Sequence, residues 1–259
     1  MTSFKDQMSL HVASRRVTDA LESASRADIV RIFDEWDNGI LTAQTVRYRL
    51  EALVRDSYRS SAAVARSVAI SSSDFPGWEP EETFTTEYLS SLIADVRRNL
   101  RGVKSGALTR DQAISRMQHT VGVAAQRGYT DQLISAYREL EEFGAQVEKY
   151  WVANFDNNVP CPACVRLHGT SVGLHENFRI ESGEPGVYKN LIGPPRHPRC
   201  KCRLFIFTVT LDNAFTSPEF ESPGTPPELI STSDVQKMPH GLFSAVKATL
   251  RAILKFLRG

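Results

Sequence analysis

Apolar side chains recur every three or four residues through most of the first 145 residues of the chain. This spacing places them on one face of an α-helix, so we predict that the N-terminal half is a bundle of helices packed through their apolar faces. The clearest stripe comprises Leu89, Leu92, Ile93, Val96 and Leu100, and a longer one follows Thr42 at Val46, Leu50, Leu53, Val54, Val64 and Val68.

Capping residues indicate where these helices begin and end. A Ser or Thr just before an apolar run predicts a helix start, and we expect starts at Ser25, Thr42 and Thr109. Thr109 is followed three residues later by Gln, which is the spacing of a capping box. Glycine commonly terminates helices, so Gly128 and Gly144 are predicted to lie at helix ends.

The hydrophobic pattern changes after residue 145. The segment QVEKYWVANFD is rich in β-branched and aromatic residues and lacks helical spacing, so we predict a strand over 147–155. The segment CRLFIFTVTL predicts a second strand. Because the two strands bracket all four cysteines, we expect an α+β fold with a helical domain over 1–145 and a small cysteine-containing, β-rich module over 146–210.

Two further segments follow the module. Residues 211–240 contain five prolines, and 211–236 has acidic residues but no Lys or Arg, which predicts an extended linker or arm. Residues 241–259 predict an amphipathic helix whose basic face carries Lys247, Arg251, Lys255 and Arg258. Such a helix has three interpretations: packing on a protein, lying on a membrane, or binding DNA.

Composition narrows the functional classes. The 259 residues are 41% hydrophobic and carry 31 Lys and Arg against 30 Asp and Glu, so any contact with nucleic acid or membrane must be local. The chain has no apolar segment of signal-peptide or membrane-span length, and we therefore expect synthesis in a cytosol. In that reducing compartment, clustered cysteines favour a metal site or reduced structural thiols over disulfides.

The cysteines form two short clusters, CPAC and HPRCKC, that suit a structural zinc ion. Each cluster supplies a chelating pair, and one tetrahedral ion bound by both would close the loop between them. Reduced cysteines buried beside stiffening prolines remain an alternative, as does a redox or disulfide pair. The candidate zinc ligands are Cys161, Cys164, His197, Cys200 and Cys202.

Two enzyme classes that use such cysteines are excluded by the sequence, and a third remains an alternative. A zinc nucleobase deaminase needs His-x-Glu upstream, and neither His11 nor His119 has Glu two residues on. A thioredoxin-like site needs its Cys-x-x-Cys at a helix start in a βαβ context, which the flanking prolines do not provide. A small zinc-dependent nuclease, or another nucleic-acid-processing module, using His168, His175 or His197 remains an alternative function.

The order of the motifs is more specific than any one of them. KYWVANFD, CPAC, LHG and GPPRHPRCKC follow one another and lead into a strand, and this set resembles the phage Mu F-like minor head protein family, also called phage head morphogenesis proteins. Lys201 stands where the family often has Arg. The matching residues are Trp151, Asp156, Cys161, Cys164, Gly169, Pro194, Pro195, His197, Pro198, Cys200 and Cys202.

The resemblance implies a non-enzymatic minor capsid protein of a tailed phage or prophage. Such a protein would be present in the virion in few copies at the portal vertex, and would act in head assembly or in genome packaging and delivery. The implied partners are the portal protein and other head proteins. The C-terminal helix would provide a further contact with such a protein. Candidates for phosphate contacts with packaged DNA, or for contacts with an acidic protein face, are Arg196, Arg199, Lys201 and Arg203.

Overall fold

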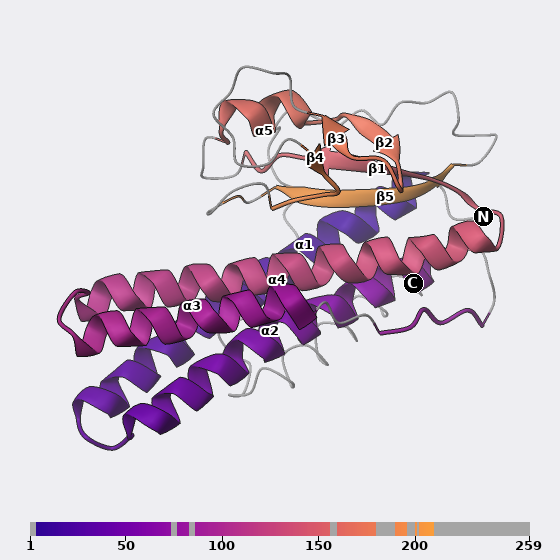
Figure 1. The fold of residues 1–259 in the computed structure, drawn as a ribbon. Helices are drawn as coiled ribbons and strands as arrows, with labels where there is room; N and C mark the ends of the chain where they lie inside the picture. Colours follow the sequence, from indigo (N-terminus) through magenta and orange to yellow (C-terminus); the bar gives the residue numbers. More distant parts are fainter. Residues whose placement is uncertain are drawn as a thin grey trace.

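The computed structural model describes residues 4–73, 77–82, 86–155, 160–179, 190–195, 200 and 202–209, which form long helices beside a small antiparallel sheet (Figure 1). The predicted α+β class is confirmed at this level. The predicted arm (211–240) and C-terminal helix (241–259) lie outside the described residues. The long helices are α1 (Phe4–Asp37), α2 (Ala43–Ser72), α3 (Thr86–Lys104) and α4 (Arg110–Glu142).

The long helices pack as the apolar stripes predicted. Val46, Leu50 and Val54 of α2 are almost fully buried and share a hydrophobic cluster with Leu92 and Val96 of α3. Helices α2 and α4 each contact the other three helices, and the contact between α2 and α4 is the most extensive. Among the helices of the described residues, none combines the length and apolar character needed to cross a membrane.

Two of the three predicted helix starts are confirmed. The hydroxyl oxygen of Thr42 accepts the backbone N–H three residues on at 3.2 Å, and Thr109 forms a capping box with Gln112. The start at Ser25 is wrong, because α1 runs unbroken from residue 4 to residue 37 and Ser25 is buried within it. The apolar pattern hides this first half of α1 because its buried face is largely polar.

The two glycines behave differently. Gly144 has φ +89° just after the C-cap of α4, which confirms the predicted helix end there. The predicted end at Gly128 is wrong, since Gly128 lies buried inside α4. A Cβ at this position would overlap the backbone carbonyl of Tyr58 in α2. Glycine is therefore required here for the close approach of two helices and not for a turn.

The sheet has the strand order β2-β1-β5, with both neighbours of β1 antiparallel to it. Both sequence-predicted strands are present, as β1 and β5, and they pair along their whole lengths from Gln146↔Val209 to Val152↔Arg203. The short helix α5 follows β1, and a separate two-stranded pair joins β3 to β4. The bounds are β1 (Gln146–Val152), α5 (Pro162–Leu167), β2 (Ser171–Gly173), β3 (Phe178–Arg179), β4 (Asn190–Leu191) and β5 (Arg203–Val209).

The outer edge of β5 is covered by polar side chains of α1. Gln7 accepts the backbone N–H of Thr208 at 3.2 Å, and Nε2 of His11 lies 2.8 Å from the carbonyl oxygen of Ile206. Gln7 and His11 are four residues apart, which is a rise of about 6 Å along a helix, and their partners are two residues apart, which is about 6.8 Å along a strand. The spacing of the two side chains therefore matches the spacing of the backbone groups that they bind. Helix α1 thus satisfies an edge that would otherwise expose unpaired backbone groups.

One hydrophobic cluster joins the bundle to the sheet. It contains Leu133 and Tyr137 of α4 together with Trp151 of β1 and Leu204 of β5, all fully buried. The cluster crosses the boundary at residues 145 and 146 at which we predicted one domain to end and the next to begin. Three of the four cysteines belong to the same cluster, so the core of the protein surrounds them.

Candidate metal centre

Local structure brings three of the cysteines together from two segments, α5 and the residues just before β5. Cys161 is the N-cap residue of α5, Pro162 occupies the first turn, and Cys164 follows on the buried side of the helix. Pro at the first position suits a helix start because its missing N–H would have no partner there. Cys202 directly precedes β5, so the pairing of β5 with β1 fixes its backbone, and Cys200 lies two residues before it.

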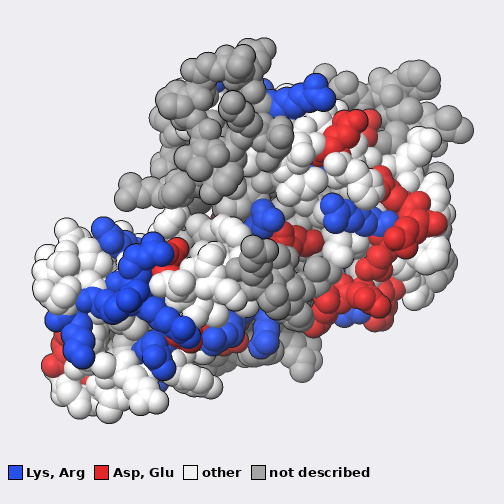
Figure 2. Space-filling model, in the orientation of Figure 1, with Lys and Arg blue, Asp and Glu red and all other residues white. Residues whose placement is uncertain are grey.

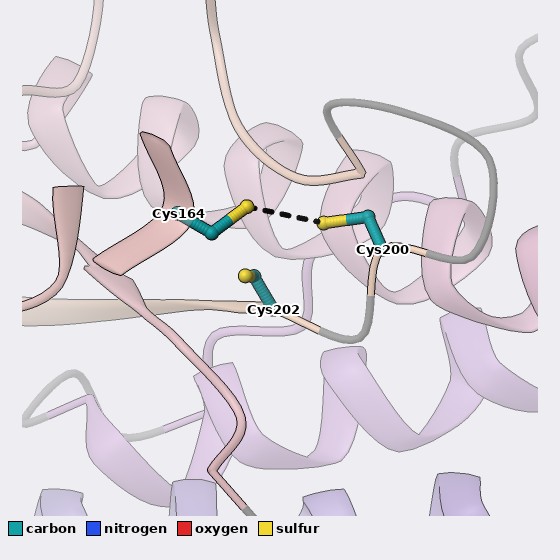
Figure 3. A group of neighbouring side chains, drawn as sticks. All are labelled: Cys164, Cys200 and Cys202. Carbon is teal, nitrogen blue, oxygen red and sulfur yellow. Dashed lines mark hydrogen bonds between the residues drawn. The ribbon is translucent and has the colours of Figure 1, made fainter. Parts of the chain in front are cut away.

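The sulfurs of Cys164, Cys200 and Cys202 converge (Figure 3). All three lie within 4.8 Å of one another, and the sulfurs of Cys164 and Cys200 are 3.9 Å apart. A tetrahedral zinc ion with Zn–S bonds of about 2.3 Å needs sulfurs about 3.8 Å apart. The distance between the sulfurs of Cys164 and Cys200 therefore matches two ligands of one tetrahedral ion, and Cys202 lies close enough to be a third. None of the four cysteines forms a disulfide.

The three thiols are buried at 1 to 3% exposure. Helix α4 supports them directly, since the side-chain amide of Gln126 donates a hydrogen bond to the carbonyl oxygen of Cys202. A second contact lies at Gly193, where an added Cβ would lie 3.2 Å from Cγ2 of Thr130. The cysteine cluster is consequently held against the bundle by close packing and by a side-chain hydrogen bond.

The surroundings of Cys164 and Cys202 keep these two thiols protonated when no cation is bound. Hydrogen bonds from Cys200 and Cys202, together with burial, raise the pKa of Cys164 far above its usual range. The pKa of Cys202 is lowered by Cys164 but raised more by Cys200 and burial, to about 12. Several buried thiolates repel one another, so their ionisation requires a positive charge among them, which a divalent metal supplies.

Trp151 provides a polar group at the same place. Its side chain is fully buried, and its indole N–H has no hydrogen-bond partner among the described residues. The indole lies near enough to Cys202 to lower the pKa of that thiol, although the two atoms do not meet the geometry of a hydrogen bond. A thiolate at Cys202 would be a suitable acceptor for this N–H.

The other predicted ligands and basic residues have different outcomes. Cys161 is half-buried and is not part of the three-sulfur group. His197 lies outside the described residues, as do Arg196, Arg199 and Lys201. Arg203 is described, and its guanidinium is buried against Asp19 of α1 at 2.7 Å. Arg203 therefore joins α1 to the sheet and does not belong to an exposed basic cluster.

The two described histidines near the module are not in the three-sulfur group either. His168 accepts the backbone N–H of Ala153 on Nδ1 at 3.1 Å, and burial lowers its pKa. A histidine with this hydrogen bond is neutral and has only its other ring nitrogen for another contact. The side chain of His175 is 68% exposed, with Nε2 2.8 Å from a carboxylate oxygen of Glu141.

One buried charge was not predicted from the sequence. Lys149 of β1 is fully buried, its ammonium donates to the carbonyl oxygen of Leu174 at 2.8 Å, and it lies 5.6 Å from the ring centre of Phe178. Burial, together with the positive charge of Arg138, lowers the pKa of Lys149 to about 8. The alternation of β1 gives the only sequence signal, because it places Lys149 on the same face as Val147 and Trp151.

Comparison with protein-family models, with curated proteins and with solved structures finds no match to this chain.

Proposed function

We propose that the chain is a minor head protein of a tailed phage or prophage, in which a structural zinc ion holds the cysteine-containing module against the helical bundle. One observation carries the metal part of the proposal: three buried sulfurs from α5 and from the segment before β5 converge within 4.8 Å of one another, and two of them are 3.9 Å apart. The head assignment rests on the motif order that resembles the Mu F-like family.

Those residues of the resemblance that the structure describes lie close together. The N–H of Gly169 donates to the carbonyl oxygen of Trp151 at 2.8 Å, and Gly169 has φ +75°, a conformation that favours glycine. Trp151 shares its hydrophobic cluster with Cys164 and Cys202. The described motif residues thus gather around the candidate centre, which supports the interpretation of the motif as one functional module.

The role proposed for zinc is structural. Cys164 and Cys200 are 36 residues apart in sequence, and an ion bound by both closes this loop. Because the site for the ion rarely exists in the unfolded chain, the free energy of zinc binding adds to that of folding, and structural zinc sites contribute on the order of 10 kcal/mol. The module would then present a rigid surface to head proteins, with no catalytic step assigned to it.

Metal analysis of the purified protein tests the zinc centre. We expect about one zinc ion per chain by elemental mass spectrometry, and a large loss of zinc in the variants Cys164→Ser, Cys200→Ser and Cys202→Ser. Val165→Ser, on the exposed side of α5, is the matched control and should keep its zinc. Equal zinc content in the wild type and the three cysteine variants would refute the site.

The head assignment needs a separate test. We expect quantitative mass spectrometry of purified particles from the encoding phage or induced prophage to find a few copies of this chain per particle. Absence from both mature particles and assembly intermediates would contradict the assignment. DNA cleavage with an added divalent metal, lost in His197→Ala, would instead favour the nuclease alternative.

A further inference from the structure

The end of the bundle at which α2 begins and α3 ends contains an apolar cavity with a basic rim. Its volume is about 350 Å³, and its apolar wall consists of Trp36, Leu100 and Ala43. Figure 2 shows that Lys and Arg predominate over this end of the molecule. The basic residues that line the cavity are Arg47, Arg97, Arg101 and Lys104.

Only part of this positive charge is neutralised within the chain. Arg97 pairs with the buried carboxylate of Glu51 at 2.8 Å, and Arg47 lies 3.8 Å from the same carboxylate. Arg101 and Lys104 are exposed and have no acidic partner among the described residues. The rim therefore has a net positive charge and favours a ligand with carboxylates around an apolar group.

The opposite end of the bundle presents such a group. Phe143, the C-cap residue of α4, is 63% exposed, and its neighbour Glu142 is exposed as well. A carboxylate oxygen of Glu139 accepts the backbone N–H of Glu81 at 3.1 Å, which brings the exposed acids Glu81 and Glu82 to the same end. Asp and Glu predominate over this end in Figure 2.

We propose that copies of this chain associate head to tail, with Phe143 and its acidic neighbours from one copy entering the Trp36 cavity of the next. The two surfaces cannot meet within one chain, because α4 has 33 residues and separates them by about 50 Å. A contact between different surfaces is heterologous, so it continues into a ring or a filament. This inference requires neither the zinc ion nor the head assignment.

The chemistry of the cavity favours a protein over a nucleic acid. Trp, Tyr and Arg are the residues most enriched at the centres of protein interfaces, and Tyr48 and Ile40, which are 70% and 69% exposed, lie on the same end of α2 and its preceding loop.

The contact is expected to be weak in isolation. One phenylalanine buries about 150–250 Å², whereas stable interfaces bury about 800 Å² on each partner. We therefore expect a dissociation constant of roughly hundreds of micromolar. Association becomes stronger when copies are concentrated at one place. Sedimentation velocity of the full chain, over about 10–500 µM, should show a rising average mass at about 50 mM salt and much less at 500 mM.

Two variants test the geometry. Phe143→Ser removes the aromatic group, and the double change Arg101→Glu with Lys104→Glu reverses the charge of the rim. We expect each variant alone to remain monomeric, with unchanged circular dichroism because all three positions are exposed. An equimolar mixture should form dimers and nothing larger, because it retains one intact surface of each kind.

The outcomes separate the proposal from its rivals. A wild-type chain that remains monomeric at low salt and high concentration overturns it. Self-association that both variants retain also overturns it, since another surface would then be responsible. A mixture that remains monomeric, although the wild type associates and each variant alone does not, contradicts the pairing of these two surfaces.

Discussion

At the scale of single residues, the cysteine centre combines predictable and unpredictable parts. The Cys-x-x-Cys and Cys-x-Cys spacings predicted that Cys164, Cys200 and Cys202 come together, and the structure places their sulfurs within 4.8 Å. Spacing alone does not show which member of a pair points inward, and Cys161 at the N-cap of α5 does not join the group. The orientation depends on the packing of α5 over the sheet.

Trp151 allows a prediction about the metal that a purely structural role would not explain. We expect Trp151→Phe to weaken zinc binding by about 10-fold, because the thiolate of Cys202 would lose a neighbouring N–H donor. Competition with a chromophoric zinc chelator measures this affinity. The control is Trp78→Phe, whose indole N–H is also buried and without a partner among the described residues. Equal affinities in both variants would exclude a contribution from Trp151.

At the scale of elements, sequence patterns predicted most of the helices, because these helices pack against one another through apolar side chains that recur at helical spacing. Helix α1 is one exception, since its first half buries Gln7, His11, Ser14 and Thr18. Gln7 and His11 form hydrogen bonds with backbone groups of β5, about two hundred residues later in the chain. No local pattern indicates such a contact, and we therefore placed the helix start wrongly at Ser25.

The contact between α2 and α4 yields a stability prediction. Gly128→Ala should lower the free energy of unfolding by about 1–3 kcal/mol, because the new methyl group overlaps the Tyr58 carbonyl and must push two helices apart. Chemical denaturation measures the change. Gly102→Ala in α3 is the control, since its methyl group would meet only the side chain of Leu108, and a smaller effect is expected. An equal effect of both changes would contradict the explanation.

His11 makes the attachment of α1 to β5 dependent on pH. Burial lowers the pKa of His11 from 6.5 to about 4, although the hydrogen bond with Ile206 partly opposes this shift. Between these two values the unfolded chain binds a proton that the folded chain does not, so stability falls as the pH falls. The loss approaches about 3 kcal/mol by pH 4.

Urea denaturation at a series of pH values measures this dependence. We expect the variant His11→Gln to show a smaller decline in stability between about pH 7 and pH 5 than the wild type. His175→Gln should retain the wild-type decline, because its side chain is 68% exposed. If all three proteins decline in parallel, other groups cause the acid sensitivity.

At the scale of the whole molecule, the fold class was predictable and the relation between its parts was not. The change of hydrophobic period at residue 145 correctly located the passage from helices to strands. The shared cluster of α4, β1 and β5 depends on which apolar faces meet in space. Hydrophobic periodicity identifies the apolar face of each element but not the element against which that face packs. The domain boundaries of the arm and the C-terminal helix remain predictions.

The shared cluster predicts cooperative unfolding. Calorimetry of the zinc-loaded protein should show the helices and the sheet melting together in one transition. The reason is that Leu133 and Tyr137 of the bundle pack in one hydrophobic cluster with Trp151 and Leu204 of the sheet. Removal of zinc with a chelator should lower the temperature of that whole transition. Two separate transitions, of which only one responds to the chelator, would show that the parts unfold independently.

The cover that α1 places over β5 has a consequence for synthesis on the ribosome. His11 is among the first residues to emerge, yet its partner Ile206 emerges 195 residues later. The helices α2 to α4 make contacts that are complete before that point, because domains and local units fold as they emerge. The groups of α1 that bind β5 therefore lack these partners until β5 emerges, although Tyr129 of α4, which emerges earlier, lies within hydrogen-bond distance of His11 and Ser14.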